Sequence, residues 1–74
     1  MSGEGAITIT LNGHIAQIAA GATVAEIIGA QGLSPEARGV AVALDGEVVR
    51  RAEWATTAVQ PGQKLEMLTA VAGG

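Results

Sequence analysis

The sequence predicts an α+β domain in which a mixed sheet of four to five strands packs on one helix. Three observations predict this class. Apolar and polar residues alternate over residues 7–11 and 64–71, as in strands that bury one face. Asn12-Gly13 and Asp45-Gly46 each stand between apolar runs, which is the pattern of two β-hairpins. Residues 23–32, between the hairpins, have the apolar spacing of a helix.

The first predicted hairpin spans residues 7–19. Ile7, Ile9 and Leu11 alternate with polar residues, and Asn12-Gly13 follows as a turn in which both residues tolerate positive φ. Residues 14–19 then return as the second strand.

The predicted helix starts and ends on recognisable signals. Thr23 and Glu26 have the spacing of a capping box, in which each side chain binds the other residue's amide. Gly32 fits the left-handed position after the last turn, and Leu33 could pack back against the helix. Three apolar residues share one helical face: Val24, Ile27 and Ile28.

Residues 34–39 read as a turn, with Pro35 opening one helical turn. Residues 40–50 form the second predicted hairpin, around Asp45-Gly46. Its first strand mixes valine and alanine, which indicates a strand covered on both sides or placed centrally in the sheet.

The last segment is predicted as irregular structure followed by a strand. Residues 51–59 read as a loop or short helical turn anchored to the core by Trp54, and residues 60–63 as a Pro-Gly turn. Over residues 64–71, Leu65 and Met67 alternate with Glu66, as in a strand with one buried face.

Two hairpins flanking a helix, with one more strand, form a β-grasp roll. The last strand would lie beside the first and parallel to it, because the elements between them supply the crossover. We therefore expect a flexible N-terminus over residues 1–5, a β-grasp domain over 6–70, and a flexible C-terminal tail over 71–74.

Composition excludes several classes of function. Four residues are basic, the formal net charge is −3, and Trp54 is the one aromatic residue. Nucleic-acid binding needs a basic surface and stacking rings, so we exclude it. The absence of cysteine excludes disulfides, thiolate metal sites and cysteine nucleophiles. No apolar run approaches the roughly 20 residues of a membrane span, and no signal peptide is present. We expect a soluble cytoplasmic protein.

The side chains present no catalytic constellation. His14 lies beside the first turn without a partner base, and we interpret it as a polar residue at a strand end. Among seven scattered carboxylates, Glu26 is explained by capping and Asp45 by the turn. No pair is predicted to act as acid and base. We therefore expect no catalytic residue, no metal site and no bound cofactor.

The carboxylate of Gly74 is the remaining candidate for a reactive group. The sequence ends on Gly73 and Gly74, shortly after the last predicted strand. An α-carboxylate has a pKa of about 3.5 and is ionised at neutral pH. It can attack the α-phosphate of ATP, and sulfur or an amine can then attack the resulting anhydride. Glycine has no Cβ, so such a tail can enter a narrow channel in an enzyme.

The chain resembles the ThiS family, the bacterial sulfur carrier proteins of thiamin biosynthesis, in four segments: "ITITLNG", "AAGATVAEII", "VAVALDGEVVRRAEW" and "QPGQKLEMLTAVAGG". The resemblance runs from about Ile7 to Gly74. Its most specific parts are "DGEVVRRAEW" and the terminal "AVAGG". It implies a ubiquitin-like β-grasp fold.

The resemblance also implies a role for the tail. A ubiquitin-activating-type (ThiF-like) enzyme would use ATP to adenylate the Gly74 carboxylate. Sulfur from cysteine, released by a desulfurase, would convert it to a thiocarboxylate. A thiazole synthase (ThiG-like) would then use this sulfur for the thiazole ring of thiamin. Val71, Ala72 and Gly73 would thread into the partner's active site, and the chain would be a co-substrate and not an enzyme.

Three residues outside the tail are candidates for docking to a partner. If Leu65 and Met67 face the helix, Leu68 and Ala70 lie on the open face of the sheet, where Leu68 could belong to an apolar patch. Arg50 and Arg51 are adjacent charges at a predicted strand end.

Two other functions share this fold and tail chemistry. One is the sulfur carrier subunit of molybdopterin synthase, which tends to have aromatic and proline residues before its final glycines; the present chain has "TAVA" there. The other is a ubiquitin-like protein modifier, in which lysine would attack the same anhydride. A β-grasp binding module with an inert tail is a third alternative.

Overall fold

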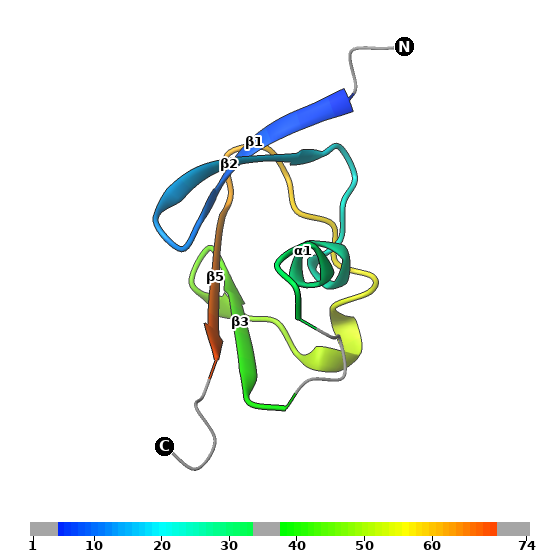
Figure 1. Cartoon of the computed structure of the whole chain (residues 1–74), viewed down its shortest axis with the longest axis vertical. Coiled ribbons are helices and arrows are strands. Elements are labelled where there is room, and N and C mark those ends of the chain that lie inside the picture. Colours follow the sequence, from blue (N-terminus) through cyan, green and yellow to red (C-terminus); the bar gives the residue numbers. More distant parts are fainter. Residues whose placement is uncertain (1–4, 34–37, 70–74) are drawn as a thin grey trace.

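A computed structural model of the chain describes residues 5–33 and 38–69. A five-stranded mixed sheet curves around one helix, α1 (Val24–Ala30) (Figure 1). The strand order is β2-β1-β5-β3-β4, which confirms the predicted β-grasp roll. The remaining elements are β1 (Ala6–Leu11), β2 (His14–Ala19), β3 (Val40–Leu44), β4 (Glu47–Val48), the 3-10 helix η2 (Arg51–Glu53) and β5 (Lys64–Thr69).

Strand β5 lies in the centre of the sheet, between β1 and β3. It pairs parallel to β1 at Leu11 and Leu65, as the sequence predicts. On its other side it pairs antiparallel to β3, from Leu65 opposite Leu44 to Thr69 opposite Val40. The last strand is therefore the element that joins the two hairpins into one sheet.

Both predicted hairpin turns are confirmed. Asn12 and Gly13 have φ of 50° and 83°, and Asp45 and Gly46 have φ of 51° and 86°. Positive φ at both central residues gives a two-residue turn whose twist matches that of the flanking strands.

The helix signals are also confirmed. Thr23 Oγ1 accepts from the Glu26 N–H at 3.2 Å, and Glu26 Oε1 accepts from the Thr23 N–H at 2.9 Å. At the other end Gly32 has φ of 86°, and the Leu33 N–H donates to the Ile28 carbonyl at 3.2 Å. This pattern is a Schellman cap.

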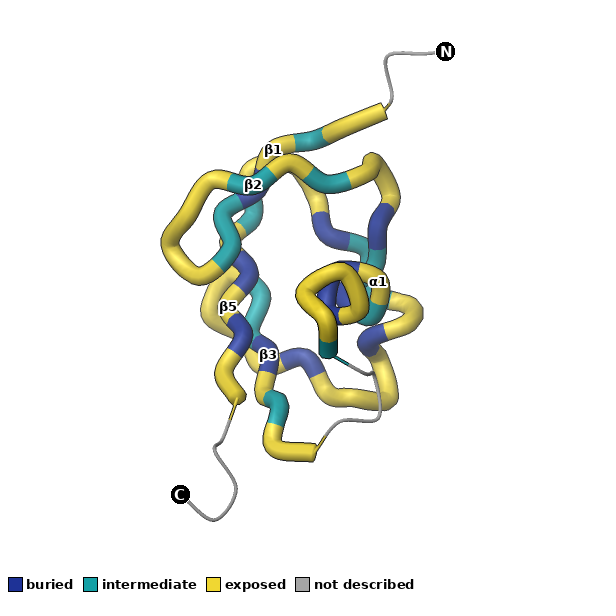
Figure 2. The backbone as a smooth tube through the Cα atoms, in the orientation of Figure 1, coloured by how far each residue is buried: buried dark blue, intermediate teal, exposed yellow. Residues whose placement is uncertain are grey.

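The core lies between α1 and the inner face of the sheet (Figure 2). The predicted helical face is buried there, together with Leu65 and Met67 of β5. Trp54 is buried directly after η2, and its indole N–H donates to the Val49 carbonyl at 2.9 Å. The predicted anchoring of residues 51–59 by Trp54 is therefore confirmed.

Strand β3 occupies a central place, one of the two situations that its composition indicates. The other, cover on both sides, is wrong because Ala41 is exposed. Most of the turn predicted over residues 34–39 lies outside the described residues, as do residues 1–4 and 70–74. The predicted domain boundaries stay predictions. Within residues 5–33 and 38–69, no helix is long and apolar enough to cross a membrane.

Candidate functional site

The tail predicted to carry the chemistry, Val71, Ala72, Gly73 and Gly74, lies outside the described residues. The last described residue is Thr69, which ends β5. The candidate site that the structure describes is therefore the surface around the end of β5, from which the chain continues toward Gly74.

An apolar patch lies on the outer face of the sheet, the face directed away from α1. Leu65 and Met67 are buried on the inner face. Because side chains alternate along a strand, Glu66 and Leu68 point outward. The Leu68 side chain is 73% exposed, and Val48 of β4 is 79% exposed. The predicted position of Leu68 on the open face is confirmed, whereas Ala70 lies outside the described residues.

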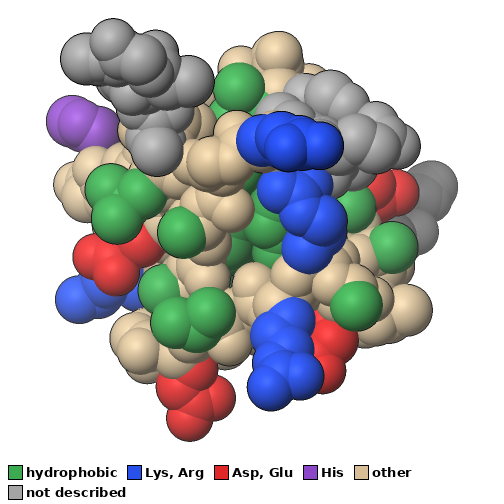
Figure 3. Space-filling model, turned by 90° about the horizontal axis from the view of Figure 1, so that it is seen from below, with side chains coloured by type: hydrophobic (Ala, Val, Ile, Leu, Met, Phe, Trp, Pro, Cys, Tyr) green, Lys and Arg blue, Asp and Glu red, His purple; other side chains and the backbone are tan. Residues whose placement is uncertain are grey.

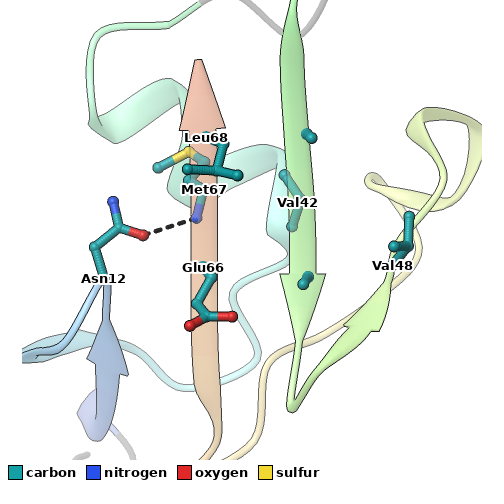
Figure 4. A pocket seen from close by; sticks show the side chains of 8 residues that line it. Asn12, Val42, Val48, Glu66, Met67 and Leu68 are labelled. Carbon is teal, nitrogen blue, oxygen red and sulfur yellow. Dashed lines mark hydrogen bonds between the residues drawn. The ribbon is translucent and has the colours of Figure 1, made fainter. Parts of the chain in front are cut away.

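Two alanines of β3 leave a hollow between these larger side chains (Figure 4). Ala41 lies opposite Leu68 of β5, and Ala43 lies between Glu66 of β5 and Val48 of β4. The resulting cavity, which we call the outer-face hollow, has a volume of about 530 Å³ and is lined by both alanines, Val48, Glu66 and Leu68. A shallow apolar depression of this kind can receive a protruding apolar side chain of a partner.

Asn12 borders the outer-face hollow from the side of β1. Its main-chain N–H donates to the Leu65 carbonyl at 2.9 Å. Its side-chain Oδ1 accepts from the Met67 N–H at 2.8 Å (Figure 4). In a regular parallel ladder the main-chain carbonyl of the same residue would make the second bond. The Asn12 side chain therefore extends the pairing of β5 beyond the point where β1 turns away.

Asp45 of the second hairpin turn holds the start of β5. Its Oδ1 accepts from the Lys64 N–H at 2.9 Å, and its Oδ2 accepts from Gln63 Nε2 at 3.0 Å. The hydrogen bond from the Lys64 main chain, followed by the bond from Gln63, lowers the pKa of the Asp45 carboxyl below its ordinary value. Residues of both hairpin turns thus fix the strand that leads to the tail.

Sequence reasoning missed these two roles. It explains Asn12 and Asp45 by their tolerance of positive φ alone. Each side chain binds a residue far along the chain, 55 positions away for Asn12 and up to 19 for Asp45. No pattern of neighbouring residues predicts contacts between residues so far apart in the sequence.

The predicted docking arginines follow β4 at the end of the sheet where β5 ends. Strand β4 runs antiparallel to β3, and the start of β3 pairs with Thr69. Figure 3, seen from below the view of Figure 1, shows Lys and Arg side chains beside hydrophobic ones on this end face. Arg50 and Arg51 are exposed, and the Arg51 guanidinium carbon lies 4.6 Å from the centroid of the Trp54 ring, within cation–π range.

The described residues include no group of three or more histidine, cysteine, aspartate or glutamate side chains that could hold a metal ion. His14 is exposed. In this part of the molecule the arrangement offers surfaces for a protein partner, namely the outer-face hollow and the two arginines. The expected lack of cofactor and catalytic residue stays a prediction.

Comparisons with known proteins place this geometry in a family. The family model described as "ThiS family" matches residues 9–74. The sulfur carrier protein ThiS of Escherichia coli (strain K12) is 35% identical over 66 residues, which cover 89% of this chain and 97% of that protein. The crystal structure of the thiamine biosynthesis protein ThiS of Geobacter metallireducens superposes with a TM-score of 0.70 at 32% identity. The superposition covers 92% of this chain and 100% of that chain. The chain therefore belongs to the ThiS family, the sulfur carrier proteins of thiamin biosynthesis.

Proposed function

We propose that this ThiS-family chain acts as a protein co-substrate that carries the transferred sulfur atom at the Gly74 carboxylate. The observation that carries the proposal is the match to the family model, which extends through residue 74 and so includes the terminal glycines. The outer-face hollow beside the end of β5 supports it, because it offers a partner enzyme a surface close to the start of the tail.

The proposed chemistry proceeds by two displacements. A Gly74 carboxylate oxygen attacks the α-phosphorus of ATP, and pyrophosphate leaves as the acyl-adenylate forms. A sulfur nucleophile then attacks the Gly74 carbonyl carbon, and AMP leaves. Hydrosulfide gives the thiocarboxylate directly. A persulfide of a cysteine desulfurase or of the activating enzyme gives an acyl disulfide, which a second enzyme thiol reduces to the thiocarboxylate as an enzyme disulfide forms.

In this proposal the carrier supplies recognition and the partners supply catalysis. A ThiF-like adenylating enzyme binds ATP, and a ThiG-like thiazole synthase accepts the sulfur, so the carrier needs no bound cofactor. Leu68, Arg50 and Arg51 dock on the partner while Val71, Ala72 and Gly73 thread toward its active site. The chain works in the cytoplasm, where both the sulfur donor and ATP are available.

The fixed position of β5 helps the carrier to bind its partner. Ordering a glycine-containing tail in a partner costs conformational entropy. Contacts of a rigid docking surface can offset this cost. The bonds from Asn12 to Met67 and from Asp45 to Lys64 hold the strand that connects this surface to the tail.

The proposal is tested by intact-mass analysis after incubation with a ThiF-like enzyme, ATP and a sulfur source. We expect the mass change of one oxygen replaced by sulfur, in a form that a thiol-alkylating reagent captures. Alkylation is essential because oxidation of Met1 or Met67 adds almost the same mass. A variant that lacks Gly74 is the control and should gain no alkylatable sulfur while unfolding at the same denaturant concentration. Adducts on lysines of other proteins, without a thiocarboxylate, would overturn the proposal in favour of a protein modifier.

A further inference from the structure

The two edges of the sheet differ in how they are protected. Strand β4 forms one edge and is only two residues long, whereas β2 forms the other edge and has six residues. Natural edge strands are commonly shortened or carry charges, prolines or bulges that prevent pairing with another chain. Strand β2, with the sequence HIAQIA, contains none of Asp, Glu, Lys, Arg and Pro, and its register with β1 is continuous. It is a long edge without these protections.

The main-chain groups of β2 alternate between β1 and the open edge. The Thr10 N–H donates to the Gln63 carbonyl on the side of β5, so Thr10 directs its main-chain groups away from β2. Its partner Ile15 therefore directs its own groups away from β1, as residues of a non-hydrogen-bonded antiparallel pair do. Because directions alternate along a strand, Gln17 and Ala19 also point outward. Among the described residues, no strand pairs with this edge.

The residues of β2 complement themselves when a second copy runs antiparallel. A two-fold axis at Gln17 places Ile15 opposite Ala19 of the second copy and Ala16 opposite Ile18 of the second copy. Each large side chain then faces a small one, and the two Gln17 amides lie side by side, where they can hydrogen-bond. Ile15 is 81% exposed in the single chain and would gain an apolar neighbour. The pairing is isologous, as a two-fold dimer requires.

We propose that β2 is a dimerisation edge at which two copies of this chain join their sheets through antiparallel pairing centred on Gln17. A groove of about 450 Å³ between β2 and α1 supports the proposal. It is lined in part by Ala16 and Ile18 of β2 and by Ile27 and Ala30 of α1. An added strand directs its inward side chains toward this apolar groove, as in strand addition generally.

The proposed dimer leaves the outer-face hollow free. The outer-face hollow is lined mainly by β3, β4 and β5, and β1 separates these strands from β2 in the sheet. Each copy therefore presents its own hollow and the end of its own β5 far from the two-fold axis. The inference is thus independent of the proposed sulfur chemistry.

The experiment is sedimentation equilibrium up to about 1 mM protein, because a contact between two six-residue strands is smaller than a standard stable interface. We expect the average mass to rise from 7.3 kDa toward twice that value. Gln17→Pro should keep the chain at 7.3 kDa, since it removes an outward N–H without removing a bond to β1. Amide protons of Ile15, Gln17 and Ala19 should show concentration-dependent NMR shifts, and those near Leu68 should not.

Charged substitutions of Gln17, which lies on the proposed two-fold axis, make the test specific. Gln17→Lys and Gln17→Glu each place like charges directly opposite one another and should weaken the dimer about twofold to fivefold. An equimolar mixture should associate more tightly than either variant alone. The matched controls are Gln60→Lys and Gln60→Glu, which make the same charge changes at an exposed turn residue outside β2.

Three results would overturn the proposal. The first is a constant mass of 7.3 kDa over the whole concentration range. The second is equal weakening by the Gln60 variants. The third is a set of concentration-dependent shifts centred on Val48 and Leu68, which would assign self-association to the outer-face hollow.

Discussion

The side-chain oxygen of Asn12 accepts a hydrogen bond from the Met67 N–H at 2.8 Å, across 55 positions of sequence. A residue of the first hairpin turn thereby holds the last strand close to the point where it continues into the tail. Asp45 of the second turn makes the equivalent connection at the start of the same strand. The two turns have a second use beyond reversing the chain, and this use can be tested separately from their backbone geometry.

Asn12→Gly should destabilise the domain by about 1–2 kcal/mol, because it leaves the Met67 N–H without its acceptor. Glycine keeps the positive φ of 50° that this turn requires, so the loss reports the side chain. Urea denaturation measures the free energy of unfolding, and hydrogen exchange measures protection of the Met67 amide. Asn12→Asp retains acceptor oxygens and is the control that should keep that protection. An unchanged exchange rate at Met67 in Asn12→Gly would contradict the assignment.

The Asp45 carboxylate should make stability fall at acidic pH. Its pKa in the folded chain is lowered from the ordinary value of 3.8, chiefly by the Lys64 main-chain bond. Above pH 3.8 the group is ionised in folded and unfolded chains, and its hydrogen bonds contribute in full. Below that value the unfolded chain takes up the proton first, and the contribution is lost as the pH falls through the folded pKa.

Denaturation curves collected between about pH 7 and about pH 2 measure this loss. Asp45→Asn keeps an acceptor and tolerates the turn's positive φ, but it cannot ionise. The free energy of unfolding of this variant should therefore depend less on pH than that of the parent chain. Identical slopes for the two proteins in the acid range would rule out a role for Asp45.

Replacing Gly29 or Gly32 with alanine should change the stability of the domain in opposite directions. Gly29 lies inside α1, and a Cβ at this position would meet no neighbouring side chain within 4 Å. Gly29→Ala should therefore stabilise the domain by about 0.5–1 kcal/mol through helix propensity. Gly32 has φ of 86° in the cap, and Gly32→Ala should destabilise by about 1–2 kcal/mol. Thermal unfolding of the pair measures both effects, and the same sign at both positions would contradict the cap geometry.

Leu68→Ser should weaken partner docking without weakening the fold. The side chain is 73% exposed, so the free energy of unfolding should change by less than about 0.5 kcal/mol. If Leu68 anchors a partner at the outer-face hollow, thiocarboxylate formation at subsaturating carrier should slow by about fivefold or more. Gln60→Ser is the control, because Gln60 is an exposed turn residue outside both the outer-face hollow and β2. Equal rates for Leu68→Ser and the parent would remove Leu68 from the docking surface.

Local signals in the sequence predicted most of the fold. The Asn-Gly and Asp-Gly turns, the Thr23–Glu26 capping box and the Gly32 cap each depend on residues within a few positions of one another. The structure confirms all of them. The parallel pairing of β5 with β1 was predictable as well, because a strand–helix–strand crossover leaves few other arrangements.

The candidate site was predictable only in part. Alternation over residues 64–69 placed Leu68 on the open face, as observed. The hollow beside it depends on Ala41 and Ala43 lying opposite Leu68 and Glu66, and such a cross-strand register is not encoded in either strand alone. The hydrogen bonds of Asn12 and Asp45 to β5 could not be predicted either, because each joins residues far apart in the sequence.

The central place of β5 has a consequence for folding. Its partners Thr10 and Val40 pair with Lys64 and Thr69, so long loops must close before the sheet is complete. Closing such loops costs entropy and slows folding. The outer-face hollow requires β3, β4 and β5 together and thus forms only when these non-local pairings are made. A partner that recognises this hollow would select folded chains and leave incompletely folded ones unmodified.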